Sequence, residues 1–127
     1  MSSFSDYLEN AALSHVFRGV ALPSPSQVYL ALYTAAPSDA GGGTEVAGNG
    51  YARQAVTFGA PAGGSIANTG AVSFTASGGS IGNVVAVGFF DAATAGNMLA
   101  WSTITAATVG DGDSINFPVG QLTINLT

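Results

Sequence analysis

Few side chains in this chain could carry out acid–base or metal chemistry. The 127 residues include one histidine, His15, two arginines, Arg18 and Arg53, and no lysine or cysteine. A nucleophilic serine needs a base to activate it, and the sequence gives His15 no neighbouring carboxylate or thiol to orient it. One histidine cannot form a zinc site. We interpret His15 as a packed or interface residue and predict a non-enzymatic protein without a metal or cofactor.

The acidic and glycine-rich segments are better explained as turns than as binding sites. The Asp111–Gly112–Asp113 segment lacks the further acids of a calcium loop, and Asp-Gly is a common hairpin turn. Asp91 precedes a loop, where its carboxylate can accept backbone N–H groups. The glycine clusters would need a lysine to form a Walker phosphate loop, and the chain has none.

Arg53 is the most suggestive polar residue. It lies in a predicted strand, and it is the only basic residue of the β region. An arginine in this setting is expected to form a planar, bidentate ion pair. We predict that its partner is Glu45, Asp39 or an acid of a neighbouring subunit.

Aromatic side chains provide one possible ligand surface. Trp101 could join Tyr29, Tyr33 and Tyr51 in a platform on which a sugar ring stacks. Aromatic residues in alternating strands are more often part of a core. Carbohydrate binding therefore stays a secondary hypothesis.

The composition favours a protein that packs against other subunits. Charged residues are 7% of the chain, whereas an ordinary soluble domain is about a quarter charged. The net charge of -5 disfavours binding to nucleic acid, which needs clustered Lys and Arg. No apolar run is long enough to cross a membrane, and the N-terminus does not resemble a secretory signal, so we expect synthesis in a cytoplasm.

The chain is expected to form one domain with a single helix. Residues 1–19 show apolar residues at helical spacing, with Ser3 as the predicted N-cap and Gly19 as the C-terminal stop. We expect the apolar face of this helix, including Phe4, Leu8 and Val16, to pack on the same subunit's sheet. Residues 20–27 form a linker containing Pro23 and Pro25.

Residues 28–127 alternate short strands with turns. In the segment 28–34, Val28, Leu30 and Leu32 share one face and Tyr29, Ala31 and Tyr33 share the other, so a central strand is predicted. This spacing indicates an antiparallel β-sandwich or jelly-roll-like barrel. The other predicted strands are 51–58, 65–68, 71–75, 83–90, 98–103, 114–117 and 121–126.

Several segments together resemble a family of small tailed-phage virion proteins that are labelled tail fibre proteins. The segments are 4–10 (FSDYLEN), 28–33 (VYLALY), 44–46 (TEV), 50–54 (GYARQ), 88–92 (GFFDA) and 120–124 (GQLTI).

The resemblance implies a structural protein of the virion, made in the host cytoplasm. Small sandwich proteins of this size also decorate phage capsids, commonly as trimers. Our first expectation is therefore a homotrimeric capsid decoration (cement) subunit that contacts the major capsid protein or other virion proteins. A tail or tail-fibre component, possible carbohydrate binding for host recognition included, is the alternative. Arg53, Glu45, Tyr51, Asp91, His15 and Trp101 are the expected interface or structural residues.

Overall fold

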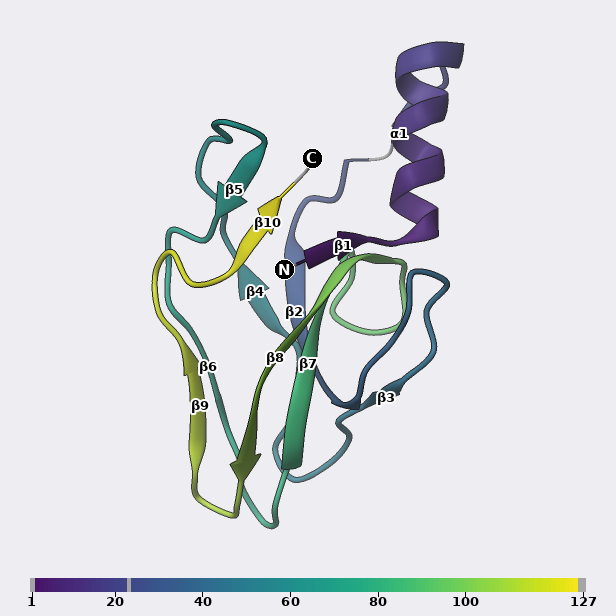
Figure 1. Ribbon diagram of the computed structural model, residues 1–127. Helices are drawn as coiled ribbons and strands as arrows, with labels where there is room; N and C mark the ends of the chain where they lie inside the picture. The colour runs from purple at the N-terminus through teal and green to yellow at the C-terminus, as the bar shows by residue number, and fades with distance from the viewer. Residues whose placement is uncertain (1, 23, 126–127) are drawn as a thin grey trace.

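The computed structural model describes residues 2–22 and 24–125, and it is built from antiparallel strands with one helix near the N-terminus (Figure 1). The predicted mainly-β sandwich with an N-terminal helix is confirmed. Predictions that involve Met1, Pro23, Leu126 or Thr127 concern positions outside the described residues. The elements are β1 (Ser2–Phe4), α1 (Asp6–Arg18), β2 (Val28–Ala35), β3 (Thr44–Glu45), β4 (Gln54–Val56), β5 (Ser65–Ala67), β6 (Val72–Thr75), β7 (Gly82–Phe90), β8 (Met98–Val109), β9 (Ser114–Phe117) and β10 (Thr123–Asn125).

The larger sheet has the order β1-β8-β7-β2-β3, and β4 also pairs with β2. The opposite layer consists of two short ladders, β6–β9 and β5–β10. All of these pairings are antiparallel. Antiparallel pairing needs no crossover helix, although several pairs, such as β6–β9 and β5–β10, join strands that are not consecutive in the chain.

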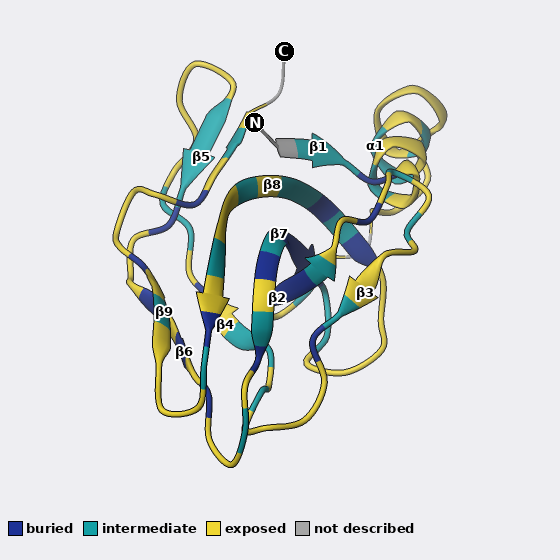
Figure 2. Ribbon diagram, turned by 60° about the horizontal axis from the view of Figure 1, so that its bottom comes forward, coloured by how far each residue is buried: buried dark blue, intermediate teal, exposed yellow. Residues whose placement is uncertain are grey.

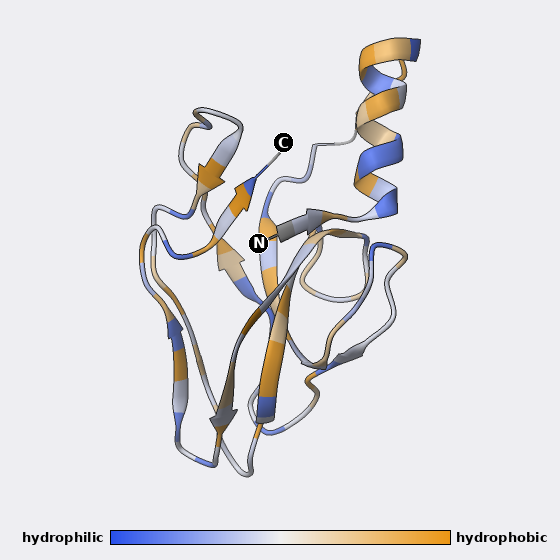
Figure 3. Ribbon diagram, viewed as in Figure 1, coloured by the Kyte–Doolittle hydropathy of each residue, from blue (hydrophilic) through white to orange (hydrophobic). Residues whose placement is uncertain are grey.

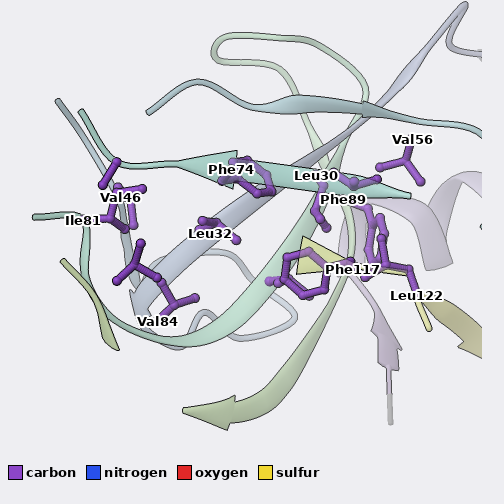
Figure 4. Close-up of a cluster of buried hydrophobic side chains, with 14 of the residues drawn as sticks. Leu30, Leu32, Val46, Val56, Phe74, Ile81, Val84, Phe89, Phe117 and Leu122 are labelled. Carbon is purple, nitrogen blue, oxygen red and sulfur yellow. The ribbon is translucent and has the colours of Figure 1, made fainter. Parts of the chain in front are cut away.

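The main core lies between the two layers. Leu30 and Leu32 of β2 point into it, together with Phe89 of β7 and Phe117 of β9 (Figure 4). The Phe74 ring meets the Phe117 ring edge-on, with centroids 6.3 Å apart. The hydrophobic effect of burying these side chains between the layers stabilises the sandwich.

A second, smaller cluster lies on the outer face of the larger sheet. It contains Ala31, Tyr33, Ala86, Phe90 and Met98. Because Leu30 and Leu32 belong to one cluster and Ala31 and Tyr33 to the other, the prediction that this strand is apolar on both faces is confirmed.

The helix differs from the expectation in its start and in its packing. Ser3 lies in β1, paired with Trp101, and the N-cap is Ser5, whose side chain accepts a hydrogen bond from Leu8 N at 3.2 Å. The stop at Gly19 is confirmed, since this residue has a φ of 69°.

The predicted docking of the helix on its own sheet is wrong. None of the helical residues is buried, and α1 projects from the sandwich with most of its length exposed (Figures 1 and 2). Of the stripe that was expected to be covered, Phe4 packs against the core from β1, Leu8 is half-buried and Val16 is 69% exposed. The reason is that residues 2–4 form β1 and pair with β8 instead of belonging to the helix. This pairing fixes the start of α1 at the edge of the sheet, and the helix points outward from there.

The predicted strand boundaries agree closely with β2, β5, β6, β7 and β9. β4 is shorter than the predicted 51–58 segment, because Tyr51 N bonds to Gly48 O in a turn. β8 continues past the predicted end at residue 103 to Val109, which pairs with Gly82. Its threonine- and alanine-rich second half has little apolar alternation, so the sequence pattern does not reveal it.

We predict that Gly88→Ala destabilises the protein by about 1–3 kcal/mol, the usual range for overpacking a core. A Cβ at this position would lie 2.9 Å from the Tyr33 ring and 3.2 Å from the Phe90 ring, both in the outer cluster. Urea denaturation measures the change. Gly70→Ala is the matched control, because a Cβ there meets nothing within 4 Å. Equal stability of the two variants would contradict this packing.

Candidate functional site

Arg53 is the centre of the most extensive side-chain network in the described structure. It immediately precedes β4, and its side chain is 8% exposed. Its Nε donates to Glu45 Oε2 and its Nη2 donates to Glu45 Oε1, each at 2.9 Å. Of the three partners that the sequence allowed, the structure shows Glu45, and the predicted bidentate geometry is confirmed.

The other side of the guanidinium holds the loop that follows β7. Nη1 donates to Ala92 O at 3.0 Å and to Ala95 O at 2.8 Å. The guanidinium carbon also lies 3.7 Å from the centroid of the Phe90 ring, which is a cation–π contact. One cation therefore joins β3, the end of β7 and the 91–97 loop.

Tyr51 completes the network, because its hydroxyl group joins Glu45 to the backbone of β2. Its hydroxyl donates to Glu45 Oε2 at 2.6 Å and accepts a hydrogen bond from Leu32 N at 3.1 Å. Its ring stacks on Phe74, with centroids 5.9 Å apart. Burial, assisted by the hydrogen bond to Glu45, raises the pKa of Tyr51 far above its ordinary value, so the hydroxyl stays protonated and keeps donating.

The charge states of the ion pair are favoured by the same contacts. Burial alone would raise the pKa of Glu45, but the hydrogen bonds from Arg53 and Tyr51 and the Arg53 charge outweigh it and lower this pKa. The hydrogen bond to Glu45 raises the pKa of Arg53 in turn. The contacts therefore favour the ionised forms of both partners, and the network acts as a clamp that holds its charges near neutral pH.

Asp91 acts within the loop as predicted. Its Oδ1 accepts from Asn97 N at 2.7 Å and its Oδ2 accepts from Asn97 Nδ2 at 3.1 Å. Gly96 has a φ of 74°, and a Cβ there would lie 2.5 Å from Asp91 Oδ1. These contacts close the loop whose carbonyl groups face Arg53.

Trp101 and Asp39 form a second attachment on the outer face. Trp101 Nε1 donates to Asp39 Oδ1 at 2.8 Å, which fixes the 36–43 loop against β8. Asp39, one of the expected partners of Arg53, is therefore engaged elsewhere. Because 62 residues separate the two side chains, no local pattern could have revealed this bond.

The aromatic residues do not assemble into one exposed platform. Tyr33 is buried in the outer cluster, where Trp101 packs, whereas Tyr51 packs in the main core on the other side of the sheet. Tyr29 is half-buried. The arrangement supports the interpretation of these rings as packing residues.

The remaining polar candidates occupy separate places. His15 is exposed on α1 rather than packed within the chain, with Nδ1 2.9 Å from Val20 O. The Asp111–Gly112–Asp113 turn joins β8 to β9, where Asp113 N donates to Gly110 O, so the predicted turn is confirmed.

One acidic group brings together three carboxylates that the sequence separates. Oxygens of Asp6, Glu9 and Asp39 lie within 4.8 Å of one another. Three oxygen ligands suit a hard cation chemically, but Ca²⁺ takes six to eight, and Asp39 Oδ1 already accepts from Trp101. Asp6 and Glu9 also sit in the first turn of α1, where their charge favours the helix.

The described part of the chain has an exposed apolar surface on and after α1, and a groove of mixed polar and apolar lining between the layers. The first, which we name the helix stripe, comprises Leu13, Val16, Phe17 and Val20. The second, the β8–β9 groove, is an opening of about 350 Å³ between the layers. Its apolar lining includes Phe89, Ile104, Ile115, Phe117 and Leu122.

Residues 3–125 match a protein family described as Podophage GP4 fiber I protein gp80. No curated protein matches the chain. Among the described residues, no helix is both long and apolar enough to span a bilayer.

Arg53→Lys is expected to destabilise the protein almost as much as Arg53→Ala, by about 3 kcal/mol, the lower end for breaking a buried pair because Glu45 is 27% exposed. An ammonium group keeps the charge but cannot serve Glu45 and two loop carbonyls in one plane. Chemical denaturation measures both variants, and Arg18→Lys, at an exposed position, is the control. Full stability of Arg53→Lys would show that charge alone suffices.

The lowered pKa of Glu45 predicts a specific loss of stability in acid. A carboxyl whose pKa is lower in the folded than in the unfolded state stabilises the fold above its unfolded value, near 4.5, and this stabilisation is lost as pH falls through the folded pKa. Denaturation at a series of pH values from about 6 to 3 should therefore show a steeper decline for the wild type than for Glu45→Gln. Parallel curves would contradict a lowered pKa.

Proposed function

Because the chain belongs to the family of the podophage GP4 fiber I protein gp80, we propose that it is a structural subunit of a tailed-phage virion, located in a tail fibre assembly. The observation that carries the proposal is the family match, which covers residues 3–125. The family description supports the tail-fibre alternative over capsid decoration, which was our first expectation.

The distribution of contacts also supports a structural, non-enzymatic role. The polar groups with the strongest interactions, Arg53, Glu45 and Tyr51, face one another and the backbone, and they hold loops onto the sheet. The helix stripe, by contrast, faces solvent on a projecting helix. A subunit whose polar side chains stabilise the fold and whose apolar side chains face outward is suited to assembly with other subunits.

We further propose that the subunit associates with copies of itself and with other virion proteins. The low charge and the exposed apolar helix support this step, and a homotrimer stays the first expectation for the oligomer. Carbohydrate recognition has less support, because the aromatic rings of the sheet are divided between two clusters.

Labelling of purified phage particles tests the location. Antibody against the chain, visualised by electron microscopy, is expected to mark the tail fibres. Labelling confined to the capsid shell would overturn the fibre location and favour decoration. If mass spectrometry and labelling both failed to detect the chain in particles, the proposed virion role would be wrong.

A further inference from the structure

We propose that the helix stripe of one copy binds in the β8–β9 groove of a second copy, so that subunits join head to tail. This inference deepens the proposed function, because it rests on the chain being a self-associating structural subunit. It identifies the two surfaces that would meet.

The helix stripe is an apolar surface that its own fold leaves uncovered. Phe17 is 78% exposed, Val16 69% and Leu13 57%. With about 100° of rotation per residue, these three side chains fall on one side of the helix, and the exposed Val20 follows the C-cap residue Gly19. Figure 3 shows orange, hydrophobic segments in the last turn of α1, before a blue, hydrophilic tip. Exposed apolar side chains that cluster in this way mark an interaction site.

The β8–β9 groove is an opening into the core. Among the described residues, β9 pairs with β6 and β8 pairs with β1 and β7, so no ladder joins β8 to β9. None of the thirteen lining residues is charged. Val119 is 62% exposed and lies in the sequence between the lining residues Phe117 and Gln121. The groove therefore has an uncharged lining in which Ser, Thr, Asn and Gln side chains stand beside apolar ones, and it suits an uncharged insert.

A subunit cannot place its own helix in its own groove while β1 stays paired. β1 pairs with Ala100 to Ser102 of β8 and leads toward Met98, where Ser5 donates to Met98 O. The groove follows β8 in the other direction, from Ser102 to Ala107. In Figure 1 the helix stands on one side of the sandwich and β9 lies on the other. The insert must come from another molecule.

Charge complementarity favours a second copy as that molecule. Arg18 follows Phe17 at the free end of the helix, is exposed and has no ion pair within the described structure. Asp111 and Asp113, both exposed, lie in the turn beyond Ala107 and Ile115, at the closed end of the groove. A helix that inserted Phe17 with its free end toward this turn would bring Arg18 near Asp111. Its long side chain can extend from the flank of the stripe.

Such a contact is heterologous, because two different surfaces meet. Head-to-tail contacts close into rings or continue as filaments, depending on the rotation between subunits. A head-to-tail contact can be distinguished experimentally from pairing of two helices, because each subunit contributes a helix to one contact and a groove to another. A subunit with a damaged helix still has a groove, and a subunit with a blocked groove still has a helix.

Sedimentation of the purified full-length protein provides the test. Phe17→Ser should weaken self-association at least about thirtyfold, as expected for a central apolar anchor. Thr105→Trp should block the groove, since Thr105 is exposed and lines it. Each variant alone should be monomeric, and an equimolar mixture should form one-to-one dimers. Ala55→Trp, at an exposed position on β4, is the control for added bulk.

Other results would overturn the inference. If Phe17→Ser abolished association while Thr105→Trp did not, the helices would be pairing with each other. If the wild type stayed monomeric at its highest soluble concentration but was found in virions, the inference and the proposed self-association would be wrong. The proposed location in the virion would stand, with another virion protein covering the helix. If the chain self-associated through these two surfaces but was absent from virions, the proposed function would be wrong and the head-to-tail contact would stand.

Two further measurements test the same interface in ways that a misfolded variant could not imitate, because each expects a contact to be gained or restored. Arg18→Glu and Asp111→Arg should each weaken association by up to about fivefold, and the double variant should restore it. Because the chain has no cysteine, Phe17→Cys combined with Thr105→Cys should form a disulfide only between molecules. Failure of both the charge exchange and the crosslink in protein that self-associates would exclude this interface.

Discussion

The central strands β2 and β7 are apolar on both faces, and both faces must be shielded from water. The β6–β9 and β5–β10 ladders cover one face with a second layer of strands. The other face receives no third layer. It is covered by side chains and by two loops, residues 36–43 and 91–97, which have little apolar surface of their own. Their position therefore depends on specific polar attachments rather than on hydrophobic burial.

Arg53 and Asp39 provide those attachments. Arg53 uses its guanidinium to bind a carboxylate, two loop carbonyls and the face of Phe90. Asp39 binds the Trp101 indole. The backbone of the 91–97 loop is constrained as well, since Ala95 has a φ of 53°, unusual for a residue other than glycine. The two loops, bound from opposite ends of the sheet face, enclose Tyr33 and Phe90 without a further sheet.

The sequence predicted the parts of this structure that follow from local patterns. The two-faced alternation of residues 28–34 revealed a central strand, and the isolation of Arg53 among acids indicated an ion pair, with Glu45 as one of three candidate partners. Ser5 and β1 were missed, because three residues paired with a strand nearly a hundred positions away have no local signature. The apolar face predicted for the helix, through Phe4, Leu8 and Val16, shares only Val16 with the exposed helix stripe. Periodicity shows that a face is apolar, and it does not show which molecule covers it.

The pairing of β1 with β8 also determines when the N-terminal strand can fold during synthesis of the chain. Ser5 and Met98 are separated by 93 residues, so the nascent chain on the ribosome has no partner for its first strand until β8 has been made. Until then, nothing fixes the direction in which α1 leaves the sandwich. The direction of the helix is therefore fixed only after residues 100–102 have been synthesised, about four fifths of the way along the 127 residues. The orientation of the N-terminal helix is thus settled by one of the later segments of the chain.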